Sequence, residues 1–293
     1  MNFLSYLING ISLGSVYALI ALGYTMVYGI AKMLNFAHGD VIMIGSYVVY
    51  FAFGASGLNP VLSIVLSMIV CTILGVVIER LAYRPLREAP SLAVLITAIG
   101  VSYLLQQVAQ LSWSSNPKSF TSVVSGMKPV SLFGGQLTIS AETIVTIVAC
   151  VVIMVVLMWF VNYTPAGHAM LAVSEDRGAA QLMGVNVNGT ISLTFAIGSA
   201  LAAIAGALLC SSYPTLQPTT GAMPGIKAFV AAVFGGIGSI PGAFVGGILL
   251  GIIEIFAKAF NTNISDAVVF AVLIVVLLVK PSGLLGKTVR EKV

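Results

Sequence analysis

Long apolar stretches separated by short polar segments dominate this chain. They cover about residues 3–31, 41–55, 60–79, 92–112, 142–163, 190–212, 226–237, 241–257 and 266–280. A helix needs about 20 apolar residues to cross a hydrocarbon core of roughly 30 Å, and most of the stretches approach or exceed that length. The pattern therefore predicts an all-α fold, a polytopic transmembrane helix bundle of about eight or nine spans.

Two of the apolar stretches, 226–237 and 241–257, are short, and the glycine-rich segment 235–242 separates them. Two short tilted crossings and one re-entrant pair both fit this pattern. Lipid cannot hydrogen-bond irregular backbone, so such a break must be buried in protein or line a wet cavity. We therefore expect short or broken helices here, and the number of spans depends on which arrangement applies.

The composition agrees with a membrane protein. Apolar residues make up 59% of the 293 positions and charged residues only 8%, whereas a soluble domain carries about 25% charged residues. Cys71, Cys150 and Cys210 lie singly in apolar stretches, as expected of small buried hydrophobic residues rather than disulfide or metal ligands. We expect no cofactor, no metal cluster and no nucleic-acid partner.

Basic residues gather in two polar segments and predict the orientation. They are Arg80, Arg84 and Arg87 after the third stretch, and Lys280, Lys287, Arg290 and Lys292 after the last. Loops rich in Lys and Arg stay in the cytoplasm, which places the C-terminus and the segment 164–189 inside. The Ser-, Asn-, Gly- and Pro-containing loop 113–141 suits the external side, and nine crossings would leave the N-terminus outside.

Short internal similarities suggest a repeat within one transmembrane domain that spans 1–293. Residues 9–13 and 188–193 open two stretches with Asn-Gly, and residues 74–79 and 250–254 end two others with Leu-Gly and a glutamate. We predict repeat halves 1–112 and 186–280, inverted relative to each other by the span between them. Inverted repeats of this kind are common in transporters.

The cytoplasmic segment 164–189 is longer than the usual connection of 2–8 residues in a helix bundle. Ser174 can cap a short helix, Glu175 and Asp176 suit its positive N-terminal end, and Gly184 can end it in the left-handed conformation. We expect a short surface helix that docks into a groove of a partner. An ordinary amphipathic loop helix is the alternative.

The same segment carries a family resemblance. Glu175, Ala179, Ala180 and Gly184 resemble the alanine-alanine-x-x-x-glycine core of the cytoplasmic loop in ABC importer permeases, although the proline that ends the longer motif is absent. Longer strings, at 9–29, 34–40 and 235–243, resemble the LivH-type permeases of branched-chain amino acid importers. That resemblance covers nearly the whole chain.

The resemblance implies a function and a set of partners. The chain would be a permease subunit, without its own nucleotide site, that translocates branched-chain amino acids across a bacterial inner membrane. Its partners would be two ABC ATPase subunits, a second permease subunit (expected to be a related but different chain) and a periplasmic amino-acid-binding protein. The segment 164–189 would couple it to the ATPases, through Gly167, Glu175, Asp176, Arg177, Ala179, Ala180 and Gly184. A related solute, such as urea or an amide, is an alternative substrate.

Polar residues near the membrane interior are candidates for the translocation path because they are costly there. The segment between the first and second stretches supplies four candidates, the polar Asn35, His38 and Asp40 and the aromatic Phe36. Hydrogen bonding at a turn is the alternative role of the polar residues. Glu254 lies deep in its stretch and either lines the path or pairs with another helix.

Two neighbouring charges are interpreted structurally. Lys258 follows Glu254 at the favourable i,i+4 spacing. Glu79 is expected to extend to the cytoplasmic interface as an anchor.

Other functional classes fit less well. Gly286-Lys287-Thr288 lacks the earlier glycine of a phosphate-binding loop, since Pro281 stands in its place. An intramembrane serine protease at 54–57 would have both histidines on the opposite face. A self-sufficient secondary carrier or channel would explain a repeat and Glu254, but it leaves the cytoplasmic helix without a role.

Overall fold

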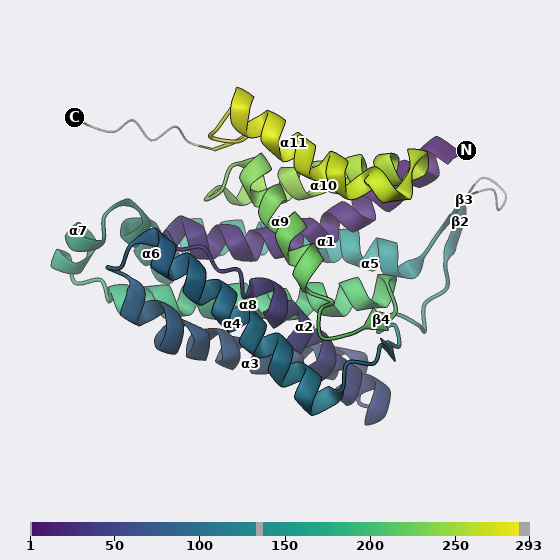
Figure 1. The fold of residues 1–293 in the computed structure, drawn as a ribbon, viewed down its shortest axis with the longest axis horizontal. Coiled ribbons are helices and arrows are strands. Elements are labelled where there is room, and N and C mark those ends of the chain that lie inside the picture. Colours follow the sequence, from purple (N-terminus) through teal and green to yellow (C-terminus); the bar gives the residue numbers. More distant parts are fainter. Residues whose placement is uncertain (1, 133–136, 287–293) are drawn as a thin grey trace.

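The computed structural model describes residues 2–132 and 137–286, and helices make up most of it (Figure 1). The α-helices are α1 (Asn2–Ala31), α2 (His38–Val49), α3 (Pro60–Ile78), α4 (Ser91–Trp113), α5 (Ala141–Tyr163), α6 (Pro165–Glu175), α7 (Arg177–Leu182), α8 (Val187–Ser212), α9 (Ala222–Gly235), α10 (Ile240–Phe260) and α11 (Ser265–Val279). Short π or 3-10 turns extend them at η1 (Tyr50–Ala55), η2 (Glu79–Tyr83), η3 (Arg84–Leu86) and η5 (Thr262–Ile264).

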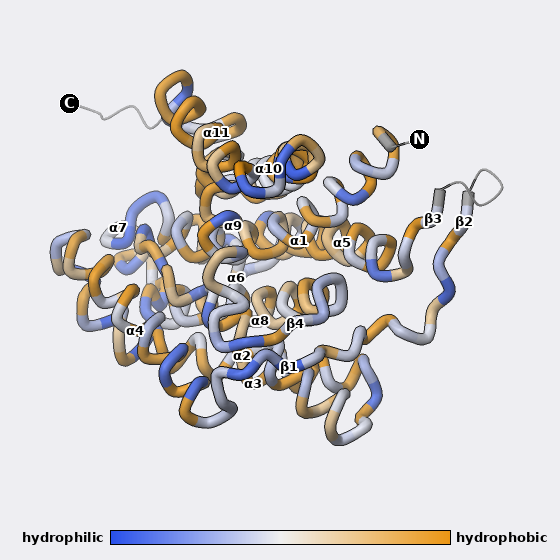
Figure 2. Tube along the Cα trace, turned by 45° about the vertical axis from the view of Figure 1, so that its right-hand side comes forward, coloured by the Kyte–Doolittle hydropathy of each residue, from blue (hydrophilic) through white to orange (hydrophobic). Residues whose placement is uncertain are grey.

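Within the described residues, seven helices are long and apolar enough to cross a membrane: α1, α3 with its following turns, α4, α5, α8, α10 and α11 with η5. Figure 2 shows hydrophobic residues along these long helices. The prediction of an all-α, multi-pass membrane protein is confirmed. The other two apolar stretches form α2 with η1 and the 14-residue α9, so a count of eight or nine spans stays a prediction.

Helices α1 and α8 form the centre of the bundle. Helix α1 packs against α10, α8, α9 and α5, and α8 packs against α3, α1 and α2. Residues 16–22 of α1 are all nearly inaccessible. The outer helices α3, α4 and α5 instead expose large apolar side chains, as lipid contact requires.

Glycines allow α1 and α10 to approach each other closely. A Cβ atom on Gly251 would lie 2.2 Å from the Cα atom of Gly14, and one on Gly247 would lie 2.4 Å from the Cα atom of Ala18. Small residues four apart permit such backbone contact between membrane helices. The spacing of these glycines predicts packing within the bundle, which the structure confirms.

The short helices α2 and α9 begin inside the bundle rather than at its ends. The ring of His38, at the start of α2, lies against Gly23 and Tyr24 well inside α1. The starts of α2 and α9 meet there, because a Cβ atom on Gly221 would lie only 1.8 Å from the carbonyl oxygen of Gly39. These interior starts explain why the two helices are short.

The two ends of the bundle differ. Helices α6 and α7 form one end, and the start of α1 lies at the other (Figure 1). In the connections, β1 (Lys118–Ser119) pairs antiparallel with β4 (Thr215–Leu216), and β2 (Val130–Leu132) pairs with β3 (Leu137–Ile139). Lys287, Arg290 and Lys292, which the orientation prediction uses, lie outside the described residues.

Candidate functional sites

The segment 164–189 forms two short helices, α6 and α7, instead of the single helix expected. Thr164 caps α6 by accepting a hydrogen bond from the N–H of Gly167 (3.0 Å), and Asp176 caps α7 by accepting one from Ala179 (3.0 Å). The prediction that Ser174 is a cap is wrong. Its hydroxyl donates to the carbonyl of Leu171 (2.7 Å), because Ser174 lies within the last turn of α6.

The structure explains why glycine occupies two positions of this segment. Gly167 is buried, and a Cβ atom there would lie 2.3 Å from the carbonyl oxygen of Phe160, so no larger residue fits. Gly184 has φ of 85°, the left-handed conformation that ends a helix. The expected turn at Gly184 is therefore present.

Helix α7 presents apolar side chains to its surroundings. Leu182 is 89% exposed and Met183 is 84% exposed, next to the exposed Ala179, whereas Ala180 packs inward. Exposed Glu175 and Asp176 precede this surface. Two adjacent, almost fully exposed apolar side chains at the polar end of a membrane protein are suited to contact with another protein.

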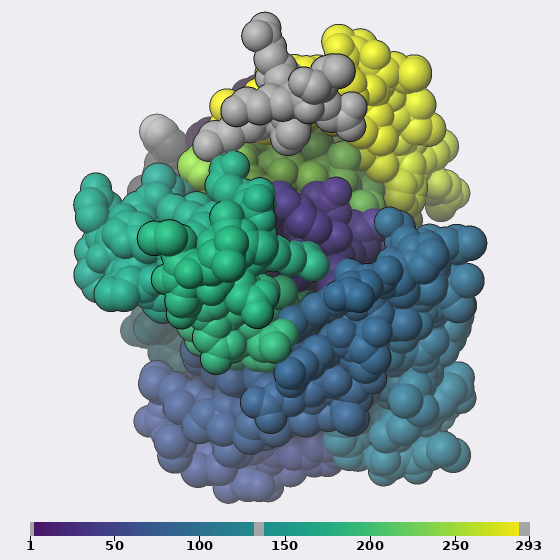
Figure 3. Space-filling model, turned by 90° about the vertical axis from the view of Figure 1, so that its left-hand side faces the viewer, coloured from purple at the N-terminus to yellow at the C-terminus, as the bar shows by residue number. Residues whose placement is uncertain are grey.

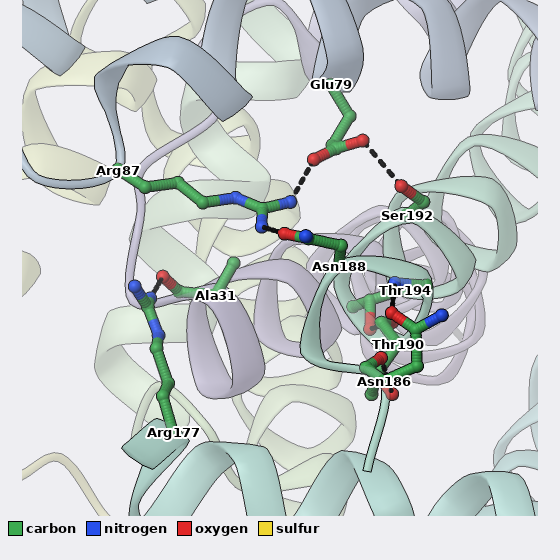
Figure 4. A network of polar contacts seen from close by, with 10 residues as sticks. Ala31, Glu79, Arg87, Arg177, Asn186, Asn188, Thr190, Ser192 and Thr194 are labelled. Atoms are coloured by element: carbon green, nitrogen blue, oxygen red, sulfur yellow. Dashed lines mark hydrogen bonds and ion pairs between the residues drawn. The ribbon is translucent and has the colours of Figure 1, made fainter. Parts of the chain in front are cut away.

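Polar contacts connect α7 to the membrane helices (Figure 4). The guanidinium of Arg177 donates to the carbonyl of Ala31, where α1 ends. Nearby, Arg87 donates to the carboxylate of Glu79 and to the side-chain oxygen of Asn188, at the start of α8. Arg177 therefore ties α7 to the end of α1, and Arg87 separately ties the connection between α3 and α4 to the start of α8.

Glu79 differs from its prediction as an interfacial anchor. It is completely buried, and it accepts hydrogen bonds from Arg87 and from the hydroxyl of Ser192 (2.6 Å). The anchor prediction is wrong because η2 and η3 turn the chain back, which brings Arg87 over the carboxylate. Glu79 thus joins α3 to α8.

The candidate path residues between α1 and α2 are buried and mostly engaged. Asn35 accepts a hydrogen bond from the Tyr83 hydroxyl (2.9 Å), and Asp40 accepts one from Gln106 (2.9 Å). The ring of Phe36 packs 5.5 Å from that of Phe229.

His38 is a partial exception. It is 1% exposed, and its Nε2 atom has no hydrogen-bond partner among the described residues. His38 and Asp40 do not pair with each other. The side chains make separate contacts to four different elements, so they do not form one polar site.

Glu254 lies in a separate cluster far along the chain from those residues. Its carboxylate accepts hydrogen bonds from Lys258 (2.6 Å), Lys227 (2.8 Å) and the Tyr17 hydroxyl (2.8 Å), and Lys227 also pairs with Asp266 (2.7 Å). The expected pair with Lys258 is confirmed. This cluster joins α10 to α1, α9 and α11.

Two cavities open beside that cluster. One of about 190 Å³ has Glu254, Lys227 and Lys258 in its wall. The other, of about 480 Å³, is lined by hydroxyl groups, including Ser12 and Ser211, and by apolar side chains. Both lie between the ends of α1, α8 and α10 that are remote from α7.

Comparison with known proteins decides the family. Residues 6–277 match the family described as branched-chain amino acid transport system, permease component. The chain belongs to this family.

Individual relatives match all or nearly all of this permease component. The high-affinity branched-chain amino acid transport system permease protein BraD of Pseudomonas aeruginosa is 45% identical over 100% of this chain and 98% of the relative. LivH of Escherichia coli K12, described in the same words, is 44% identical with the same coverage. The probable permease LivH of Methanocaldococcus jannaschii is 31% identical over 92% of this chain and 88% of its own length.

Sequence reasoning missed three charged residues that organise this permease component. Lys227 and Asp266 complete the Glu254 cluster, and Arg87 neutralises Glu79. Lys227 had a usable signal, because it is a charge inside the apolar stretch 226–237 and intramembrane charges seek partners. Arg87 had none, since its partners are set by the turn of the chain.

Proposed function

We propose that the chain is the translocation subunit of an ABC importer for branched-chain amino acids. Two separate ATPase subunits would supply the energy, and a binding protein would deliver the amino acid. A second permease subunit, related but different, would complete the passage. Full-length relatives at 44–45% identity that are described as permeases for this substrate class support the proposal.

One observation carries the coupling role. Helix α7 holds Leu182 and Met183 almost fully exposed at the end of the bundle, while Arg177 in the same helix reaches the end of α1. A partner that binds the two apolar side chains would therefore pull on a membrane helix through a direct contact. We assign Gly167, Asp176 and Gly184 the role of fixing α6 and α7 in position for that partner.

The orientation belongs to this proposal. Arg80, Arg84 and Arg87 lie in the connection between α3 and α4, and loops rich in arginine remain in the cytoplasm. Helices α6 and α7 would share that side, where ATP is available. The start of α1 and the two cavities beside Glu254 would then face the outside of a bacterial inner membrane, toward the binding protein.

We also propose that the halves 1–112 and 186–280 are inverted repeats. Helix α1 packs on α10 and α9, and α8 packs on α3 and α2, which is the same pattern with the halves exchanged. Each half also has a buried glutamate that accepts a hydroxyl hydrogen bond from the first helix of the other half. These pairs are Glu79 with Ser192 and Glu254 with Tyr17.

The proposal also concerns the translocation path. We propose that the segment around Asn35, Phe36, His38 and Asp40 moves during transport, because it lies where α1, α2 and α9 meet. Glu254 would act at the external end of the path. A branched-chain zwitterion needs polar groups for its charged ends and apolar lining for its side chain, and the external cavities contain both.

The test replaces the exposed apolar surface of α7. In the double variant Leu182→Glu, Met183→Glu, two apolar contacts to an ATPase become charges, which costs at least about 2 kcal/mol, roughly 30-fold in affinity. We expect the ATPase subunits to be lost on purification and ATP-driven leucine uptake to fall by at least that factor. The amount of chain in the membrane should not change.

The matched control is Met127→Glu, which alters another exposed methionine, 64% accessible, in the connection between α4 and α5. It should bind the ATPases and transport leucine as the parent chain does. Undiminished uptake by the double variant would contradict the coupling role. Uptake by the purified chain alone, without ATP, would show a secondary carrier instead.

A further inference from the structure

A cavity of about 440 Å³ lies beside α7 and has no place in the transport scheme above. It is formed by the end of α1, the start of α4 and the start of α7. Figure 3 looks at this end of the molecule and shows atoms of α1 at the bottom of a depression between the segment of α6 and α7 and the segment that includes α4. We call it the basic cavity.

Positive charge dominates its lining. Lys32, Arg87 and Arg177 contribute to the wall, and no carboxylate among the described residues does. Glu79 offsets the charge of Arg87 from behind, which leaves Lys32 and Arg177 without a carboxylate partner in the described part of the chain. Burial and the nearby charge of Arg87 lower the pKa of Arg177 from its ordinary value. Such a collection of like charges is unfavourable unless an anion joins it.

Unused hydrogen-bond donors also face this region. The Nε atom of Arg87 is buried and has no acceptor among the described residues. Helix α4 begins at the cavity with Ser91, and Pro90 before it offers no side-chain cap. The first N–H groups of a 23-residue helix therefore add a partial positive charge at the same place.

The remaining wall is apolar and borders the lipid-facing surface. Met33, Leu34 and Val94 line the cavity. On the outer side of the same turns of α4, Leu92 is 64% exposed and Ile96 is 61% exposed, as expected of side chains that contact lipid. A ligand that fits this lining has an anionic group joined to an apolar body and enters from the bilayer.

We propose that the basic cavity binds the phosphate headgroup of an anionic phospholipid from the cytoplasmic leaflet. The leaflet assignment rests on the orientation in the proposed function. Basic pockets between membrane helices on the cytoplasmic side are the recognised setting for such headgroups. Here the bound phosphate lies against Arg177, the first residue of α7, so the lipid steadies the segment that contacts the ATPase.

The experiment measures lipid binding by the purified full-length chain with its co-purifying partners. Native mass spectrometry counts phosphatidylglycerol and phosphatidylcholine bound to the parent and to Lys32→Asn. Asparagine is chosen because Lys32 has φ of 54°, a conformation that asparagine tolerates. The control is Lys128→Asn, which removes an exposed lysine from the connection between α4 and α5.

We expect the parent to prefer phosphatidylglycerol and Lys32→Asn to bind it roughly fivefold more weakly, the effect of one basic contact. The Lys128→Asn control should match the parent. Equal binding by parent and Lys32→Asn, or equal binding of both lipids by the parent, would overturn the proposal. Displacement of the lipid by equimolar inorganic phosphate would also overturn it, because the ligand would then be a soluble anion.

This measurement requires no transport. Failure of the lipid proposal would leave the importer proposal standing, and loss of leucine uptake in the Leu182→Glu, Met183→Glu variant would bear only on coupling to the ATPase.

Discussion

The buried charges around Glu254 allow a quantitative prediction for Glu254→Gln. The cluster holds two lysines and two carboxylates, and Glu254 is completely buried. Glutamine keeps the shape of the side chain but leaves one positive charge in excess. Removal of one member of a buried ion pair costs about 3–5 kcal/mol, because the remaining charge is desolvated without compensation.

The structure places this variant near the lower end of that range. Lys227 keeps Asp266 as a partner, and the side chain of Lys258 is already 34% exposed and can turn toward water. We therefore expect a loss of about 3 kcal/mol in the free energy of unfolding. At roughly 2–4 °C per kcal/mol, the midpoint of thermal unfolding would fall by about 6–12 °C.

The chain offers a convenient assay for this loss. Cys71, Cys150 and Cys210 are free and buried, so a thiol-reactive fluorogenic dye reports unfolding of the detergent-solubilised protein. Glu88→Gln is the control because Glu88 is exposed, and its free energy of unfolding should stay within about 0.5 kcal/mol of that of the parent.

A second variant tests the physical cause. Adding Lys258→Gln to Glu254→Gln restores neutrality, with Lys227 and Asp266 as the remaining pair, so part of the lost stability should return. A Glu254→Gln midpoint equal to that of Glu88→Gln would refute the reasoning. So would a double variant whose loss equals the sum of its single losses, since charge imbalance would then have no role.

Two further predictions concern packing and capping. Gly251→Ala should lower the free energy of unfolding by about 1–3 kcal/mol in the dye assay, because its Cβ atom would meet the backbone of Gly14. The control Gly100→Ala lies in open space on α4 and should be neutral or stabilising. Equal midpoints for the two variants would contradict close α1–α10 contact. Asp176→Ala should remove the cap of α7, at a local cost of about 1 kcal/mol, and so raise the hydrogen-exchange rate of the Ala179 amide about fivefold. In Asp176→Asn that amide should exchange as it does in the parent. An Asn variant that behaves like the Ala variant would argue against the cap.

The sequence predicted the features that depend on composition and spacing. Apolar length identified the membrane helices, and glycines four residues apart indicated close helix packing without saying which helices meet. The ion pair between Glu254 and Lys258 could be predicted because both residues lie on one helix, one turn apart. Such features are local, so a single chain segment contains the whole signal.

Features that depend on contacts between distant parts of the chain could not be predicted from the sequence. Glu79 was assigned to the interface because Arg80 follows it, yet its partner is Arg87, which two irregular turns bring back over it. Ser174 was a reasonable cap by residue type, but Thr164 already starts a helix that runs past it. The starts of α2 and α9 depend on contact between Gly39 and Gly221, far apart in the sequence.

The contact between α1 and α10 has a consequence for biogenesis. Helix α1 is synthesised long before α10, which covers its glycine face and is followed by only one more α-helix in the described part of the chain. Contacts between segments so far apart in the sequence form slowly, and until α10 is in place the hydroxyl of Tyr17 lacks Glu254 as its acceptor. Chains that stop short of residue 240 therefore lack the helix that covers the glycine face of α1.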